Sequence, residues 1–197
     1  MKGLLGDNPD DATALDEDTL VGLKPTWIAT RADLNAAEEQ NISSATVWAG
    51  NRHWSPRQIL NERSLRQLHA RMFGEVWRWA GTWRKVGTNV GLAPHLIQTS
   101  LRMVLDDARF WVDNSTYLAD EMSVRVHHRL AWIHPFPHGN GRHARLVEDL
   151  LASSLGRPVF TWGARGLNDV GRTRTAYIRA LQVADHDYQP LLAFAQS

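Results

Sequence analysis

The sequence predicts an all-α protein with one small β-hairpin. Three observations support this prediction. Proline and capping residues mark several helix starts, apolar residues recur at helical spacing between them, and only one stretch combines β-branched residues with glycines. At 197 residues the chain is long enough to bury one substantial core, so we expect one main domain.

The first expected helix runs from Arg31 to about Ala49. Thr30 can cap its N-terminus, and Asp33 stands near the position that completes a capping box. Gly50 follows, and glycine is the residue that most often ends a helix. We expect the later helices to cover about residues 55–74, 75–79, 94–113, 118–133, 142–154, 169–184 and 190–195.

Residues 82–91 have the character of β structure. This stretch contains Val86, Thr88 and Val90, which are β-branched, together with two glycines. We therefore predict a small hairpin or extended flap at this point of the chain.

The N-terminus differs in composition from the remainder of the chain. Residues 1–18 hold six acidic side chains against one basic side chain and contain few large apolar groups, so we expect a flexible acidic arm. Residues 19–197 are expected to form a single domain. Its core would cover about 55–197, and residues 19–54 would be a helical extension.

Composition and charge exclude several classes of protein. The net charge is +1, and about +6 without the acidic arm, which is too small to predict nucleic-acid binding. No apolar run approaches the ~18 residues that a membrane span needs, and the N-terminus lacks the apolar region of a signal peptide. The absence of cysteine excludes disulfides and fits a reducing compartment. We expect a cytoplasmic protein without membrane or direct nucleic-acid contact.

The stretch that organises the chain is the motif at residues 134–145, His-Pro-Phe-Pro-His-Gly-Asn-Gly-Arg-His-Ala-Arg. Its prolines end the preceding helix, because proline lacks an amide hydrogen and restricts its neighbour. The Gly-Asn-Gly turn can place successive amides around an anion, and the next helix adds its N-terminal dipole. Arg142 and Arg145 stand in the first turn of that helix, where the dipole disfavours cations. Their presence predicts a bound anion, and phosphate fits best.

The motif resembles the signature of the Fic family, His-x-Phe-x-(Asp/Glu)-Gly-Asn-Gly-(Lys/Arg)-x-x-Arg. The specified positions match, except that His138 replaces the acid. The flanks are similar as well, at residues 79–84 and 177–185. The N-terminal portion, the motif variant and the C-terminal end resemble a bacterial subgroup called mobile mystery protein B. The resemblance implies a Fic-type helical bundle with the flap beside the active-site loop.

The resemblance implies a protein adenylyltransferase, which moves AMP from ATP to a Ser, Thr or Tyr hydroxyl of a target protein. His134 would be the general base for that hydroxyl. Phe136 would be a structural wedge that fixes the loop. The residues expected to bind the phosphates of ATP are Gly139, Asn140, Gly141, Arg142, Arg145 and His138. The flap that would register the backbone of the target consists of Lys85, Val86, Gly87, Thr88 and Asn89.

His138 leaves the chemistry open. The family places Asp or Glu at this position to hold Mg²⁺, and neutral imidazole is a poor ligand for that hard cation. A protonated His138 could contact phosphate directly. Three outcomes follow: AMP transfer without the usual metal, a different nucleotide or phosphoryl reaction, or a catalytically altered protein that binds nucleotide or a protein partner without AMP transfer. Phosphoryl transfer from an inverted nucleotide is disfavoured, because both motif glycines are intact.

A second feature of the family is an inhibitory helix with the pattern (Ser/Thr)-x-x-x-Glu-(Gly/Asn), whose glutamate pairs with the second motif arginine. Thr46 and Asn51 fit this pattern, but Gly50 stands in the place of the glutamate. We therefore expect a separate inhibitory partner. The subgroup that the chain resembles is associated with a helix-turn-helix companion protein.

Several residues near the motif have alternative interpretations. His127 and His128 could form a metal site with the two motif histidines, although such histidines are more often satisfied polar groups. Tyr177 could line the adenine pocket or belong to the core. His143 is expected to be exposed, and the nine tryptophans are expected in the core.

Overall fold

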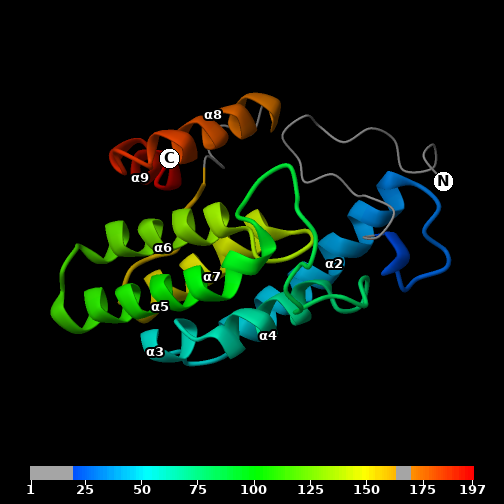
Figure 1. Cartoon of the computed structure of the whole chain (residues 1–197), viewed down its shortest axis with the longest axis horizontal. Coiled ribbons are helices and arrows are strands. Elements are labelled where there is room, and N and C mark those ends of the chain that lie inside the picture. Colours follow the sequence, from blue (N-terminus) through cyan, green and yellow to red (C-terminus); the bar gives the residue numbers. More distant parts are fainter. Residues whose placement is uncertain (1–19, 163–169) are drawn as a thin grey trace.

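The computed structural model describes residues 20–162 and 170–197, and the regular elements in this part of the chain are all helical (Figure 1). The acidic arm predicted at residues 1–18 lies outside the described residues. The helices, in chain order, are α2 (Arg31–Gly50), α3 (Pro56–Ile59), α4 (Glu62–Phe73), the 3₁₀ turn η1 (Pro94–Leu96), α5 (Ile97–Asn114), α6 (Ala119–Ile133), α7 (Asn140–Ser154), α8 (Val170–Val183) and α9 (Gln189–Ala195).

The capping signals in the sequence place the first helix starts correctly. Thr30 Oγ1 accepts the amide hydrogen of Asp33, and the Asp33 carboxylate accepts that of Thr30, which forms the expected capping box of α2. Ser55 and Gln58 form the same arrangement at α3. The single helix expected over 55–74 is interrupted, however, because Asn61 caps a new helix through its side chain.

Two further expectations are corrected by the structure. The helix expected at 75–79 is a turn, which joins Trp77 to Leu23 through an isolated antiparallel bridge. The hairpin expected at 82–91 is an irregular loop, and the described residues contain no named strand. Its backbone is used differently: Arg84 N–H donates to Pro135 O at 2.9 Å, and Leu92 N–H donates to Ile133 O at 3.3 Å. The backbone of the loop is therefore hydrogen-bonded to the end of α6 and to the turn that follows it. The β-branched residues of the loop alone are not enough to produce a strand.

α7 lies at the centre of the fold. It packs against α6, α4, α3 and α2, and its apolar side chains join the main hydrophobic core. α8 and α9 pack on each other and form a second, smaller core with Trp162 and Val124. Figure 1 shows this pair above α6 and α7. The motif turn between α6 and α7 is therefore anchored in the main core, and the second core lies next to it.

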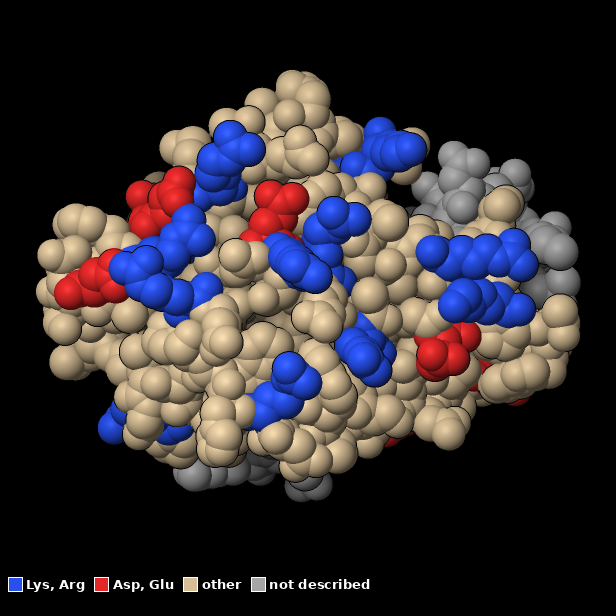
Figure 2. Space-filling view, turned by 90° about the horizontal axis from the view of Figure 1, so that it is seen from below, with Lys and Arg blue, Asp and Glu red and all other residues tan. Residues whose placement is uncertain are grey.

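The tryptophans divide between interior and surface. Trp77 is fully buried, whereas Trp27 and Trp132 are 62% and 44% exposed, so the expectation that all nine lie in the core is wrong. Among the described residues, no helix combines the length and the apolar character needed to cross a bilayer. On the face drawn in Figure 2, the basic side chains stand in several separate groups and do not merge into a single patch.

Candidate active site

The motif turn is shaped by two residues in left-handed backbone conformations. His134 is the C-cap of α6, with φ of 53°, and Gly139 is the N-cap of α7, with φ of 77°. A Cβ at position 139 would meet the Phe73 ring at 2.3 Å, so only glycine fits there. Asn140 closes the turn, because its side chain accepts the Phe136 amide hydrogen and donates to the Phe136 carbonyl oxygen, each at 2.8 Å. These contacts keep the turn rigid.

Phe136 occupies the position of the expected structural wedge. Its side chain is fully buried and stacks on the imidazole of His69 with ring centroids 3.7 Å apart. His69 in turn receives the Gly81 amide hydrogen and lies 3.0 Å from His138 O. The turn is therefore attached to α4, where Phe73 and His69 form its floor.

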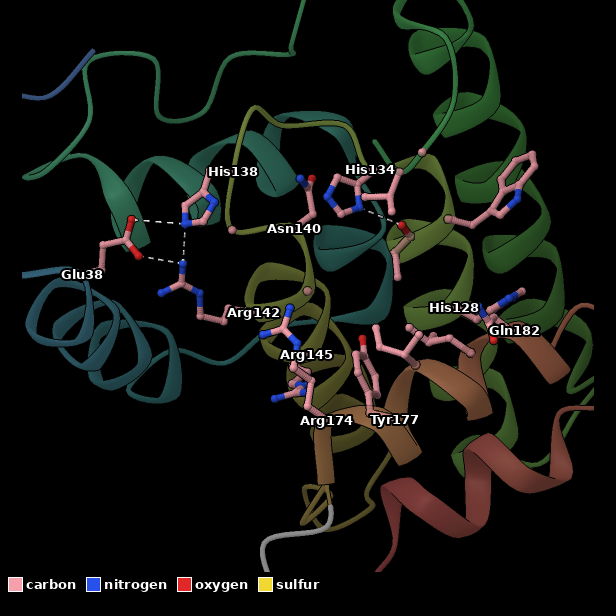
Figure 3. Close-up of a pocket in the computed structure, with 18 of the residues that line it drawn as sticks. Glu38, His128, His134, His138, Asn140, Arg142, Arg145, Arg174, Tyr177 and Gln182 are labelled. Atoms are coloured by element: carbon pink, nitrogen blue, oxygen red, sulfur yellow. Dashed lines mark hydrogen bonds and ion pairs between the residues drawn. The ribbon is translucent and has the colours of Figure 1, made fainter. Parts of the chain in front are cut away.

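A cavity of about 820 Å³ opens beside the turn, a volume within the usual range of small-molecule sites. Figure 3 shows its side chains, which come from α2, α6, α7 and α8, from the motif turn and from the loop before η1. The expected site residues that line it are His134, His138, Gly139, Asn140, Gly141, Arg142 and Arg145. The expected flap residues 85–89 do not line it, although Val90 and Gly91 of the same loop do. The structure therefore brings the motif residues together around one cavity.

His134 is held in one tautomer by its own helix. Its Nδ1 lies 3.1 Å from Ala131 O, and a ring nitrogen beside a carbonyl oxygen must carry the hydrogen. Nε2 is then the nitrogen that can accept a proton. Burial lowers the pKa of His134 to about 4, with the charge of Arg84 acting in the same direction. The imidazole is therefore neutral near pH 7.

Arg84 fixes the backbone around His134. Its side chain donates to His134 O at 2.6 Å, to Val86 O at 3.0 Å and to Leu92 O. The residue is only 3% exposed, and burial lowers its pKa. The Arg84 guanidinium therefore connects the loop at 82–92 with the C-terminus of α6. These hydrogen bonds hold the loop in place without strand pairing.

Glu38 is a site residue that the sequence did not predict. It lies on α2, is 2% exposed, and its carboxylate lies 2.7 Å from Arg142 Nη2 and 3.5 Å from His138 Nε2 (Figure 3). Trp77 Nε1–H also donates to it at 2.7 Å. Burial alone would raise the pKa of Glu38, but the hydrogen bond with His138 and the charge of Arg142 lower it to about 2. Glu38 is therefore ionised.

A signal for Glu38 exists in the sequence. Position 38 falls on the same face of α2 as the buried residues Leu34, Asn41 and Ala45. A carboxylate on the apolar face of a helix must be paired, and the partner turns out to be a motif arginine. The pattern alone does not say which cation the partner is.

Arg145 is framed by aromatic residues of the second core. Its guanidinium carbon lies 4.7 Å from the Tyr177 ring centroid and 5.4 Å from that of Trp162. The Tyr177 hydroxyl lies 2.9 Å from His127 Nε2. Tyr177 belongs to the second core, where it is 7% exposed, and it also lines the cavity.

Two further histidines in or near the motif, His128 and His143, have structural partners. His128 lies 3.2 Å from the Tyr188 hydroxyl and 3.3 Å from Asp185 Oδ1. In the described part of the chain, no group of three potential ligands is placed to hold a metal ion, so the histidine metal site is not formed there. His143, expected on the surface, is 1% exposed, and its Nε2 lies 2.9 Å from Leu65 O, because α7 is surrounded by other helices.

The residues present do not fit the Mg²⁺ ion that the resemblance implies. Mg²⁺ requires an octahedron of oxygen ligands, but His138 offers a nitrogen that lies 3.0 Å from Arg142 Nη2. The neighbouring carboxylate of Glu38 already accepts hydrogens from Trp77 and Arg142. A divalent cation at this point would lie against a guanidinium, which repels it.

The fold and the site together define a class of protein. Its members are all-α domains with a glycine-rich turn and two arginines beside a cavity large enough for a nucleotide. Residues 59–152 match the model of the Fic/DOC family. It is 29% identical over 137 residues to the protein adenylyltransferase fic-1 of Caenorhabditis elegans, covering 65% of this chain and 25% of that protein. The fic-1 relative from Caenorhabditis briggsae matches to the same extent. The matched segment thus spans a quarter of these curated relatives.

Solved structures share the fold. The N-terminal Fic domain of a Bartonella effector protein from Bartonella sp. AR 15-3 has a TM-score of 0.71 at 18% identity and covers 91% of each chain. BepC from Bartonella tribocorum, solved with bound AMPPNP, has a TM-score of 0.68 at 22% identity and covers 89% of this chain and 90% of its own. At these identities the likeness shows the Fic helical fold.

Proposed function

We propose that this chain is a protein adenylyltransferase that moves AMP from ATP to a hydroxyl side chain of a target protein. The observation that carries the proposal is the single cavity shared by a neutral His134, the Gly-Asn-Gly turn and two motif arginines. The curated relatives are named protein adenylyltransferases, and one structural neighbour holds AMPPNP. Both facts support a nucleotide as the ligand of the cavity.

The proposed reaction is an in-line displacement at the α-phosphate. His134 Nε2 accepts the proton of the target hydroxyl, whose oxygen forms a bond to the α-phosphorus. The bond from that phosphorus to the oxygen that bridges it to the β-phosphate breaks, and pyrophosphate leaves with the electron pair. The hydrogen bond from Nδ1–H to Ala131 O supports this role, because it stabilises the imidazolium that forms.

The remaining motif residues would hold the nucleotide. The amides from Gly139 to Gly141 begin α7, where backbone donors and the helix dipole attract phosphate. Arg142, Arg145 and His138 would contact the phosphate oxygens. Asn140 would act through the shape of the turn, since its side-chain amide is already bonded to the backbone of Phe136.

The loop at 85–89 would receive the target. Lys85, Val86, Gly87 and Asn89 are exposed, and Val86 is an exposed apolar side chain at 44%. Arg84 holds this loop beside His134, so a target backbone lying along the loop would present its hydroxyl near the base. This arrangement supports the flap role that the resemblance implies, without a hairpin.

A second candidate function is nucleotide or partner binding without transfer. The observation that favours it is the ion pair between Glu38 and Arg142, which places a buried negative charge next to the proposed phosphate site. A site with this charge and without the family acid could bind nucleotide and turn over poorly.

Label transfer from α-³²P-ATP tests the two candidates. The transferase proposal predicts labelling of a target or of the chain itself, and loss of labelling in His134→Ala. Persistent labelling in that variant would refute the assigned base. His138→Glu adds a carboxylate beside Glu38, and Mg²⁺-dependent labelling gained by that variant would support an intact site that lacks only its metal ligand. AMPPNP binding with no labelling in either protein would favour the second candidate.

The proposal also covers setting and partners. The motif variant supports membership of the bacterial mobile mystery protein B subgroup, hence a cytoplasmic protein with a helix-turn-helix companion as regulator. Co-purification of the chain with that companion, followed by labelling with and without it, tests this assignment. A companion that neither binds nor changes labelling would refute it.

A further inference from the structure

We propose that Arg31 and Arg174, two arginines outside the motif, complete a four-arginine subsite that binds the polyphosphate tail of the nucleotide in place of a divalent metal. The proposal rests on the nucleotide-binding part of the proposed function. It assigns phosphate contacts to α2 and α8, which flank the motif turn.

The need for additional positive charge follows from the site itself. A nucleoside triphosphate brings several negative charges, and the motif supplies two arginines. One of them, Arg142, already faces the ionised Glu38 at 2.7 Å, so part of its charge is compensated within the protein. Because the donor set around His138 does not fit Mg²⁺, the missing charge must come from side chains.

α2 turns one face toward the cavity. Arg31, Asn35 and Glu38 all line it, and their spacing of four and three residues places them on one face of the helix. Glu38 marks the end of this face that touches Arg142. Arg31 lies about 10 Å further along the axis, at a rise of about 1.5 Å per residue. Its long side chain can therefore reach a phosphate group beyond the one at Arg142.

Arg174 contributes from the opposite wall. It lies on the first turns of α8 and lines the cavity, and its charge lowers the pKa of Tyr177 in opposition to burial. Tyr177 is also the ring against which Arg145 packs. Arg174 and Arg145 are thus grouped around one tyrosine at the same side of the cavity (Figure 3). A guanidinium pair of this kind matches the oxygen geometry of phosphate.

Calorimetric titration of the full chain with AMPPNP and with AMP, each in EDTA and in Mg²⁺, tests the proposal. The wild-type chain is expected to bind AMPPNP in EDTA within about threefold of its affinity in Mg²⁺. Arg31→Ala and Arg174→Ala should each weaken AMPPNP binding by about tenfold, the value of one charged hydrogen bond. AMP lacks the β- and γ-phosphates, so its affinity should change by less than about twofold.

Matched variants separate the subsite from general effects of charge. Arg179→Ala on α8 and Arg102→Ala on α5 remove exposed arginines that do not line the cavity, and both should bind AMPPNP as the wild type does. Arg31→Lys and Arg174→Lys keep the charge and should recover part of the lost affinity. Thermal unfolding of each variant shows that the fold is retained.

Three results would overturn the proposal: wild-type affinity for AMPPNP in both alanine variants, equal loss of AMP and AMPPNP, or wild-type binding that requires Mg²⁺. Failure of the transferase proposal is distinguishable. If AMPPNP binding follows the expected pattern and no label is transferred, the subsite proposal is supported and the transferase proposal is refuted. If labelling depends on His134 while Arg31→Ala and Arg174→Ala keep the wild-type KM for ATP, the transferase proposal is supported and the subsite proposal is refuted.

Discussion

At the scale of single residues, His134, the base that we propose, has an unusual combination of properties. Its Nδ1–H is committed to Ala131 O, and burial lowers its pKa to about 4. A base acts when it is unprotonated, so a lowered pKa keeps it competent in more acidic solution. We predict that kcat/KM for AMP transfer stays level from pH 8 to about 5 and falls as the pH approaches 4. Initial-rate measurements, with return to pH 7 as a control for unfolding, check this. A fall in kcat/KM centred between pH 6 and 7 would contradict this prediction.

Gly91 is a second residue that matters at this scale, because the position of His134 depends on it. Its φ is +95°, and a Cβ there would meet His134 Cβ at 2.3 Å and Ile133 O at 3.1 Å. We predict that Gly91→Ala displaces His134 and lowers label transfer by about 100-fold, since small misplacements of a catalytic group are that costly. It should also lower the free energy of unfolding by about 1–3 kcal/mol. Gly50→Ala, where the new Cβ meets no heavy atom within 4 Å, should leave label transfer unchanged and should not lower the free energy of unfolding.

At the scale of elements, α2 is coupled to α7 through Glu38. Glu38→Gln keeps an acceptor for Trp77 Nε1–H and removes the charge that faces Arg142. We predict tighter AMPPNP binding, by several-fold, because a negative charge next to the proposed phosphate site is lost. The free energy of unfolding should fall by about 2–4 kcal/mol, because Arg142 loses its buried partner. Titration calorimetry and denaturant unfolding measure the two effects. Glu39→Gln, at an exposed position of the same helix, is the control. Weaker binding in Glu38→Gln would mean that Glu38 positions Arg142 for phosphate.

Elements governed by local chemistry are the ones that the sequence predicts well. The caps at Thr30 and Ser55 depend on contacts over three residues, so the pattern contains all the information. The loop at 82–91 depends on Arg84, which bonds carbonyl oxygens up to 50 residues away, and no strand pattern encodes that contact. The predicted hairpin was wrong for this reason, although the loop does lie beside the motif.

At the scale of the whole molecule, the candidate site also contains some residues that the sequence predicts and others that it does not. The motif residues are contiguous, so their convergence on one cavity followed from the sequence. Glu38 and Arg142 are 104 residues apart, and Arg174 arrives from a helix of the second core. Such contacts depend on how the helices pack, which periodicity does not specify. His143 illustrates the converse error, because its exposure depends on the burial of α7 as a whole.

The two cores meet at a buried carboxyl group. Glu148 belongs to α7, is fully buried, and accepts the Trp162 indole hydrogen at 3.2 Å. Burial, together with the charge of Asp149, raises the pKa of Glu148 to about 9. Between pH 4.5 and 9 the folded chain therefore keeps a proton that the unfolded chain releases. Folding stability must then fall as the pH rises through this range.

Replacing Glu148 tests whether this group limits the stability of the molecule. Gln matches the protonated carboxyl in shape and can still accept from Trp162, but it does not titrate. We predict that Glu148→Gln is more stable than the wild type at pH 8, and that the difference grows by more than about 1.4 kcal/mol between pH 5 and pH 8, the value of one pKa unit. Denaturant unfolding at both pH values measures it, with Glu39→Gln as a surface control. A difference independent of pH would show that Glu148 is ionised in the folded chain. The negative charge of Glu148 would then act on Arg145 and weaken the phosphate binding that we propose for that arginine.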